Sequence, residues 1–163
     1  MSERDLDELA SRCLSYDPDT GVFTRLVGPH KSLIGKPTGL LTVRGYVWVW
    51  LGGKRYAAHR LAWRLTTGEW PVQHLDHING DKTDNRMCNL REVTQAQNLQ
   101  NIRSARPCNP TGFLGVSRRP NGKFSAGITV DHQHHKLGTF ETAEEAHAAY
   151  VKAKRELHPW GTL

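Results

Sequence analysis

Residues 74–101 read HLDHINGDKTDNRMCNLREVTQAQNLQN, and this stretch decides the fold of the first half of the chain. Its pattern predicts a short strand over residues 72–77, a polar loop, a second strand over residues 89–93 and a helix beginning at Thr94. The Asn-Gly and Asp-Asn pairs of the loop are typical turn formers. Gln97 stands three residues after Thr94, as in a capping box. The segment is therefore expected to be a β-hairpin followed by a helix.

Asp76 and His77 are adjacent at the end of the first predicted strand, so their side chains face opposite sides of the hairpin. Asp76 could hold a metal while His77 faces a water molecule. A hairpin folded over the helix could bring Asn98 to Asp76. A carboxylate and an amide, completed by water and phosphate, suit Mg²⁺ (or Mn²⁺) and argue against zinc. Taken one at a time, each residue has an ordinary structural explanation: His77 could be a turn histidine, Asp76 could cap the end of a strand, and Asn98 could be a solvated helix residue. The prediction of a site therefore depends on the spacing of the three residues together.

The block DHINGDKTDN-x(3)-NLR-x(6)-N resembles the HNH endonucleases of the ββα-metal type found in phage homing nucleases. His77, Asn89 and Asn98 match the H, N and final H/N of that family. The resemblance implies that His77 is the general base, that Asn89 orients His77 across the loop, and that Asp76 and Asn98 bind one divalent ion. Lys82 and Arg86 lie in the same loop and could contact phosphates, or could simply be solvated.

The stretches YDPDTGVFTR and GYVWVWLGGKRYAAHRLAWRLTTGEWP also resemble this family, which extends the likeness over residues 5–102. Their patterns predict a helix over residues 3–15, strands over 22–27, 43–51 and 54–58, and a helix over 59–67 that ends at Gly68. The Gly52-Gly53 pair is a hairpin signal between the last two strands. Four tryptophans are expected in the core because large apolar side chains are usually buried: Trp48, Trp50, Trp63 and Trp70.

Residues 109–163 predict a three-stranded antiparallel sheet and one helix. The strands are expected at 114–119, 123–130 and 136–140, with an exposed His-rich turn at 132–135. Thr142 and Glu145 form a capping box for the helix. The helix is expected to bury one stripe, made of Ala146, Ala149, Tyr150, Ala153 and Leu157.

The stretches GVSRRPNGKFSAGI and KLGTFETAEEAHAAY resemble the plant ethylene-response-factor (APETALA-type) DNA-binding domain, which places such a sheet in the DNA major groove. Basic side chains of this sheet are expected near DNA, namely Arg118, Arg119, Lys123 and Lys136. Several positions depart from the plant pattern, so its sequence specificity does not transfer: Ser117, Asn121, Phe124 and Thr129.

The charge distribution favours a polyanionic partner. The chain has 163 residues and a net charge of +6, and residues 22–106 hold thirteen Lys and Arg against five Asp and Glu. Three widely spaced cysteines without a CxxC pair argue against a zinc ribbon and against a disulfide framework. No apolar run has the ~20 residues of a membrane span. We therefore expect a cytoplasmic protein, in the host cell if a phage encodes it.

Together these patterns predict an α+β chain: a ββα-metal HNH nuclease module over residues 1–102, a linker over 103–108, and a small three-stranded antiparallel sheet plus one helix over 109–163. The expected function is metal-dependent DNA endonuclease, nicking or cleaving double-stranded DNA as a monomer or homodimer. The alternative is a non-catalytic sequence-specific DNA-binding regulator. Tethering a second DNA-binding module would raise overall affinity through effective concentration.

Overall fold

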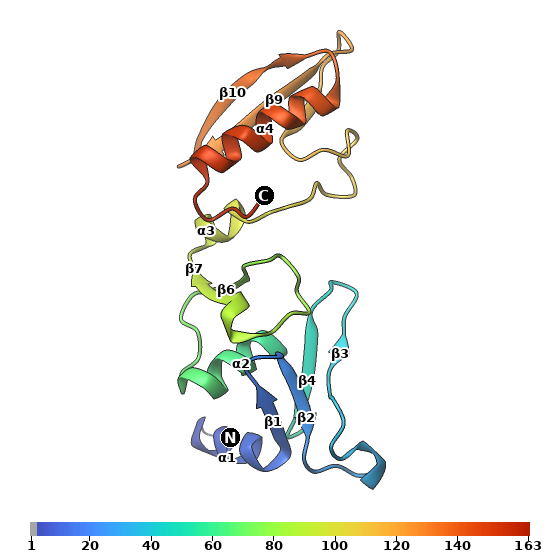
Figure 1. Ribbon diagram of the computed structural model, residues 1–163, viewed down its shortest axis with the longest axis vertical. Helices are drawn as coiled ribbons and strands as arrows, with labels where there is room; N and C mark the ends of the chain where they lie inside the picture. The colour runs from blue at the N-terminus through green and yellow to red at the C-terminus, as the bar shows by residue number, and fades with distance from the viewer. Residues whose placement is uncertain (1–2) are drawn as a thin grey trace. The chain divides into compact units, whose positions relative to one another are not determined.

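The computed structural model describes residues 3–163, and the chain divides into two compact units between Thr94 and Gln95 (Figure 1). Both units combine helices with small antiparallel sheets, which confirms the α+β class. The division falls inside the range 1–102, so residues 95–102 group with the second unit. The functional domain bounds 1–102 and 109–163 remain a prediction. None of the helices in the described part of the chain is both long and apolar enough to cross a membrane.

The first unit begins with helix α1 (Glu3–Cys13), strand β1 (Leu14–Asp17) and strand β2 (Val22–Arg25). The predicted helix over residues 3–15 is wrong at its end, because Leu14 and Ser15 pair with β2 instead. The turn between the strands is tight: the carboxylate of Asp17 accepts bonds from Asp19 and Thr20, and Gly21 adopts a φ of 73°. The hairpin therefore depends on a glycine at position 21.

A second, three-stranded sheet has the order β3-β4-β5, with β3 at Leu40–Leu41, β4 at Val47–Leu51 and β5 at Lys54–Ala57. A short 3₁₀ helix, η1 (Lys31–Leu33), precedes it. The strand predicted to start at residue 43 starts four residues later, because Thr42 and Tyr46 close a turn in which Gly45 has a φ of 82°. Helix α2 (Ala58–Thr67) follows and ends at Gly68, as predicted.

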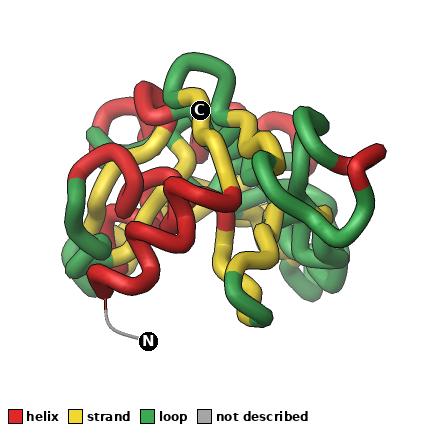
Figure 2. Tube along the Cα trace, turned by 90° about the horizontal axis from the view of Figure 1, so that it is seen from below, coloured by secondary structure: helices red, strands yellow, loops and turns green. Residues whose placement is uncertain are grey.

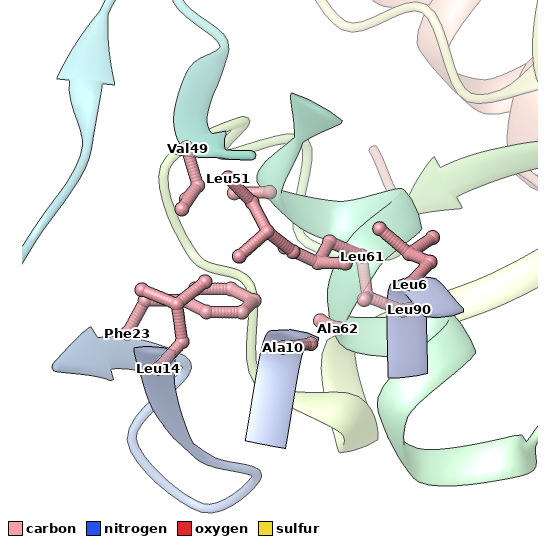
Figure 3. Packing of buried hydrophobic residues seen from close by; sticks show 10 residues of the cluster. Leu6, Ala10, Leu14, Phe23, Val49, Leu51, Leu61, Ala62 and Leu90 are labelled. Atoms are coloured by element: carbon pink, nitrogen blue, oxygen red, sulfur yellow. The ribbon is translucent and has the colours of Figure 1, made fainter. Parts of the chain in front are cut away.

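The core of this unit lies between α1, α2 and the two sheets (Figure 3). Its buried members are Leu6, Ala10, Leu14, Phe23, Val49, Leu51, Ala58, Leu61, Ala62 and Leu90. Trp63 and Trp70 pack against this cluster, as predicted. Trp50 does not belong to the core: it is 50% exposed, and the Arg55 guanidinium lies 5.6 Å from its ring centroid. The alternation of β4 explains this, because Val49 and Leu51 occupy the inner face.

Strands β6 (His74–His77) and β7 (Leu90–Val93) form the predicted hairpin, with the 3₁₀ helix η2 (Met87–Asn89) in the connecting loop. Helix α3 (Gln95–Gln100) follows Thr94 directly, which gives the expected ββα order. Residues 101–115 then form no regular structure and lead to the C-terminal sheet (Figure 1). Figure 2 distinguishes the helices, strands and loops of the described residues by colour.

The C-terminal sheet has the order β10-β9-β8, with β8 at Val116–Arg118, β9 at Phe124–Val130 and β10 at Gln133–Phe140. Helix α4 (Ala143–Leu157) packs against it and begins with the predicted capping box. The expected turn at residues 132–135 is wrong. Asp131 and His132, with φ of 46° and 65°, make a tighter turn, so His134 and His135 belong to β10.

The buried stripe of α4 also differs from the prediction. Ala146, Tyr150 and Ala153 are buried as expected, but Leu157 is 42% exposed. Lys154 is buried instead, and its ammonium group donates a hydrogen bond to the carbonyl of Ile102. Burial lowers the pKa of Lys154 to about 8. The Ile102 carbonyl thus gives the Lys154 ammonium group a hydrogen-bond partner, which allows a lysine to be buried on the face of α4 that was predicted to be apolar.

Candidate active site

The β6–β7 hairpin places the two central residues of the predicted site. Asp76 pairs across the strands with Arg91, and His77 pairs with Leu90. Both Asp76 and His77 are buried, at 8% and 4% exposure. Because adjacent strand residues face opposite sides, the hairpin is covered on both faces at this point. Two polar side chains are thus held in a water-poor environment by the rest of the unit.

The Asn89 side chain closes the loop between the strands. Its carbonyl oxygen accepts a hydrogen bond from the Asn79 N–H at 2.9 Å, and its amide nitrogen donates to the Asp84 carbonyl at 2.8 Å. Asn89 is 5% exposed, so both bonds are sheltered from water. Asn89 therefore fixes the loop as a whole. An orienting role toward His77 would act through the loop backbone.

The amide that reaches His77 is that of Asn85, a residue the sequence analysis treated only as turn chemistry. The Oδ1 atom of Asn85 lies 3.3 Å from Nε2 of His77, and its Nδ2 donates to the Thr83 carbonyl at 3.0 Å. The second bond fixes the orientation of the amide, so Oδ1 can only accept. Nε2 of His77 therefore carries the proton, and Nδ1 is left as the proton-accepting nitrogen.

The N-terminal hairpin supports this arrangement from outside the loop. The Tyr16 hydroxyl donates to the Asn85 carbonyl at 2.8 Å, and the Met87 N–H donates to the Pro18 carbonyl at 3.0 Å. A Cβ atom built on Gly21 would lie 2.5 Å from the Arg86 nitrogen. The β1–β2 turn thus packs directly on the loop backbone, and only glycine permits that approach.

We expect Asn85→Ala to reduce the rate of any reaction that uses His77 by about tenfold, because the imidazole would lose the acceptor that fixes its tautomer. Asn79→Ala is the matched control, since it removes an exposed amide of the same loop that bonds to Asp84 rather than to His77. The rate constant of His77-dependent turnover would be compared at equal folded fraction. An unchanged rate in Asn85→Ala would remove this residue from the site.

His77 shares its surroundings with two other rings. The ring centroid of His59 lies 5.2 Å away in an edge-on arrangement, and that of Tyr46 lies 6.2 Å away. Burial lowers the pKa of His77, partly offset by the bond to Asn85 and by the Asp76 carboxylate. The neutral imidazole is therefore favoured, which is the form a general base needs.

Asp76 is held in an ion pair. Its Oδ2 accepts hydrogen bonds from Nε and Nη2 of Arg91 at 3.0 and 2.8 Å, a contact the sequence analysis did not anticipate. Its cross-strand register made the contact possible. Asn98 lies on α3 in the second compact unit. The use of Asp76 and Asn98 as ligands of one ion therefore belongs to the proposal below.

The predicted phosphate contacts of the loop have different surroundings. The Lys82 ammonium donates to the Arg44 carbonyl at 3.1 Å and lies 4.6 Å from the Tyr46 ring centroid. Arg86 makes a two-pronged bond to the Asp84 carboxylate at 2.7 and 2.8 Å, which lowers the pKa of Asp84 to about 2. Both cations are exposed. Lys82 therefore lies beside the Tyr46 ring, which neighbours His77, whereas the charge of Arg86 is neutralised by Asp84.

The basic residues predicted on the C-terminal β10-β9-β8 sheet are all exposed. Arg118 ends β8, Lys136 lies in β10, and Lys123 forms an ion pair with Glu141. A groove of about 390 Å³ runs over this face, and its lining includes Arg119, Lys136 and several small polar side chains. The two cations in its lining favour an anionic ligand.

Two segments of the chain are similar to known proteins of two different kinds. Residues 56–100 match the HNH endonuclease family. A solved structure of the HNH homing endonuclease I-HmuI is similar to the chain, with 26% identity, 56% of this chain and 53% of the other covered, and a TM-score of 0.41.

The C-terminal region is similar to plant AP2/ERF domains. The ethylene-responsive transcription factor LEP of Arabidopsis thaliana is 51% identical over 49 residues, which are 29% of this chain and 23% of that protein. The ethylene-responsive transcription factor FZP of Oryza sativa subsp. japonica is 50% identical over 46 residues, covering 27% and 14%. The chain thus spans less than a quarter of the length of these relatives. Both predicted resemblances are confirmed: residues 56–100 match the HNH endonuclease family, and the C-terminal region is similar to AP2/ERF domains.

Proposed function

We propose that this chain is a metal-dependent DNA endonuclease that hydrolyses phosphodiester bonds, with the AP2/ERF-like domain positioning it on double-stranded DNA. The observation that carries the proposal is His77, a buried neutral imidazole whose Nε2 is held by Asn85, located inside the HNH segment. The similarity of the C-terminal region to DNA-binding transcription factors supports DNA as the substrate. The particular biological role that we propose is that of a homing nuclease of phage type.

In this mechanism His77 acts as the general base. Its Nδ1 takes a proton from the attacking water while Nε2–H remains bonded to the Asn85 carbonyl oxygen. The resulting imidazolium is stabilised by that bond and by the nearby Asp76 carboxylate. Asn89 keeps the loop closed during the reaction, because its two bonds join both ends of the loop. Lys82, and Arg86 where it exchanges Asp84 for phosphate, would bind the DNA backbone.

The donor set fits a divalent ion of the Mg²⁺ type. Asp76 offers a buried carboxylate, and the described residues contain no group of three His, Cys, Asp or Glu that would enclose a metal. Mg²⁺ commonly uses one or two carboxylates and completes its shell with water and phosphate. When bound by Asp76 and Asn98, Mg²⁺ or Mn²⁺ would supply charge stabilisation for the phosphate and the leaving 3′ oxygen. Arg91 must then share the Asp76 carboxylate with the ion.

Conversion of supercoiled plasmid tests the proposal. The full chain should produce nicked circles with Mg²⁺ or Mn²⁺ and none with EDTA. One active site per chain predicts nicking by a monomer, and linear product would require a homodimer or two successive events. Salt-sensitive binding to DNA without cleavage in any metal would instead identify a non-catalytic regulator, the competing hypothesis.

The exposed basic face of the C-terminal sheet should determine the affinity for DNA. We expect the double variant Arg119→Ala/Lys136→Ala to weaken DNA binding about tenfold or more and to reduce the salt dependence of binding by about two charges. The matched control is Lys152→Ala, an exposed lysine of helix α4 outside the groove lining. Binding isotherms at several salt concentrations provide the measurement. Equal salt slopes in both proteins would place the DNA elsewhere.

A further inference from the structure

His59 lies in a three-ring cluster with the proposed general base. It is the second residue of α2, and its ring meets that of His77 edge-on at a centroid separation of 5.2 Å. Tyr46 completes the cluster, with its ring centroid 5.4 Å from that of His59. The sequence pattern alone predicts no functional role for His59. Its position beside His77 depends on the packing of α2 against the rest of the first unit.

One nitrogen of His59 has no hydrogen-bond partner. Among the described residues, Nδ1 of His59 is buried and unpaired, whereas Nε2 of His77 meets an amide oxygen. Buried polar atoms without partners are uncommon in folded proteins, and a catalytic role is one of the explanations for them. The His59 residue as a whole is only partly buried, and its Nε2 is not among these buried, unpaired atoms, which leaves Nε2 as the ring nitrogen available to a ligand.

The surroundings of His59 keep it neutral. Burial lowers its pKa to about 4, and the nearby His77 and Arg60 act in the same direction. The first turn of a helix also disfavours a cation. A neutral imidazole carries a single proton. Among the described residues Nδ1 has no partner in either tautomer, and the tautomer with its proton on Nε2 is the one in which His59 can donate a hydrogen bond to a bound ligand.

We propose that His59 is a further catalytic residue of this site, which donates a hydrogen bond from Nε2–H to a phosphate oxygen of the DNA held beside His77. The inference rests on the proposed function. A neutral imidazole can stabilise developing negative charge without surrendering its proton, as known enzymes show. The two histidines then divide the work: His77 accepts a proton from water, and His59 remains a neutral donor. A proton on His77 repels a second one on His59, which keeps the roles distinct.

Three substitutions separate this role from ring packing. His59→Phe keeps an aromatic ring against His77 and Tyr46 but removes both nitrogens. His59→Gln places an amide N–H near the position of Nε2, and His59→Asn places one near Nδ1. We expect single-turnover cleavage to fall about tenfold to a hundredfold in the Phe variant. Gln should recover part of the rate and Asn should not. The pH dependence should keep its shape, because His77 remains the base.

Wild-type cleavage rates in the Phe variant would show that the ring only packs, and rescue by Asn rather than Gln would assign the contact to Nδ1. Either result overturns the proposal. Nitrogen-15 NMR of the free protein gives a readout independent of cutting, and we expect a neutral imidazole with its proton on Nε2. A proton on Nδ1 in a protein that cuts DNA would refute the role of His59 alone. Absence of cleavage by the wild type would refute the proposed function and this role together.

Discussion

Replacing His77 with alanine is expected to abolish DNA cleavage and to leave DNA binding intact. The variant removes the only atom that the mechanism uses to take a proton from water, and a positioned general base contributes about 10²- to 10⁴-fold to rate. The contacts proposed for DNA lie on other side chains, including Arg119 and Lys136, so affinity should change little. Plasmid nicking and a binding isotherm on the same preparation measure the two effects.

His74→Ala is the matched control for this experiment. His74 belongs to the same strand and pairs with Val93, but its side chain is exposed. Its loss should leave cleavage near the wild-type rate. Because His77 is 4% exposed, its truncation also leaves a cavity, and thermal unfolding must show that the variant is folded at the assay temperature. A folded His77→Ala protein that still nicks plasmid would exclude His77 as the base.

Asp76→Asn is expected to remove metal-dependent cleavage and to lower the stability of the first unit. The substitution keeps the shape of the side chain but withdraws the negative charge that a divalent ion requires. It also leaves the Arg91 guanidinium facing an uncharged amide at a site where the two side chains are 19% and 9% exposed. Breaking a buried ion pair by removing one partner costs about 3–5 kcal/mol, and partial exposure of Arg91 should reduce this figure.

The two effects of Asp76→Asn can be separated by adding Asp76→Asn/Arg91→Gln. This double variant removes both charges and should recover part of the lost stability without recovering cleavage. Mn²⁺ binding, followed by water proton relaxation, should be weaker in both variants. Asp81→Asn is the control, because Asp81 is an exposed carboxylate of the same loop whose side-chain hydrogen bonds, within the described part of the chain, go to Thr83. Full Mn²⁺-dependent cleavage by Asp76→Asn would contradict its assignment as a ligand.

Local patterns predicted the elements of the site well. The hairpin, the loop and the helix start at Thr94 follow from alternation, turn residues and caps, all of which act over a few residues. The same holds for the Gly68 end of α2 and the capping box at Thr142. The predicted ends of helices and strands were wrong where pairing with a strand distant in sequence determines them. Leu14 joins β1 because Arg25 is there to pair with it, which helical periodicity does not reveal.

What the sequence by itself determined is the order of the elements, the spacing of His77, Asn89 and Asn98 along the chain, and the resemblance of two segments to known families. Only the tertiary structure decided which groups surround the reactive side chains. Asn85 meets His77, Arg91 meets Asp76, and His59 lies beside the proposed base. Tyr16 supports Asn85 across 69 residues of sequence. Spacing along the chain fixes local geometry, whereas burial, tautomer and ion pairing depend on which surfaces the core brings together.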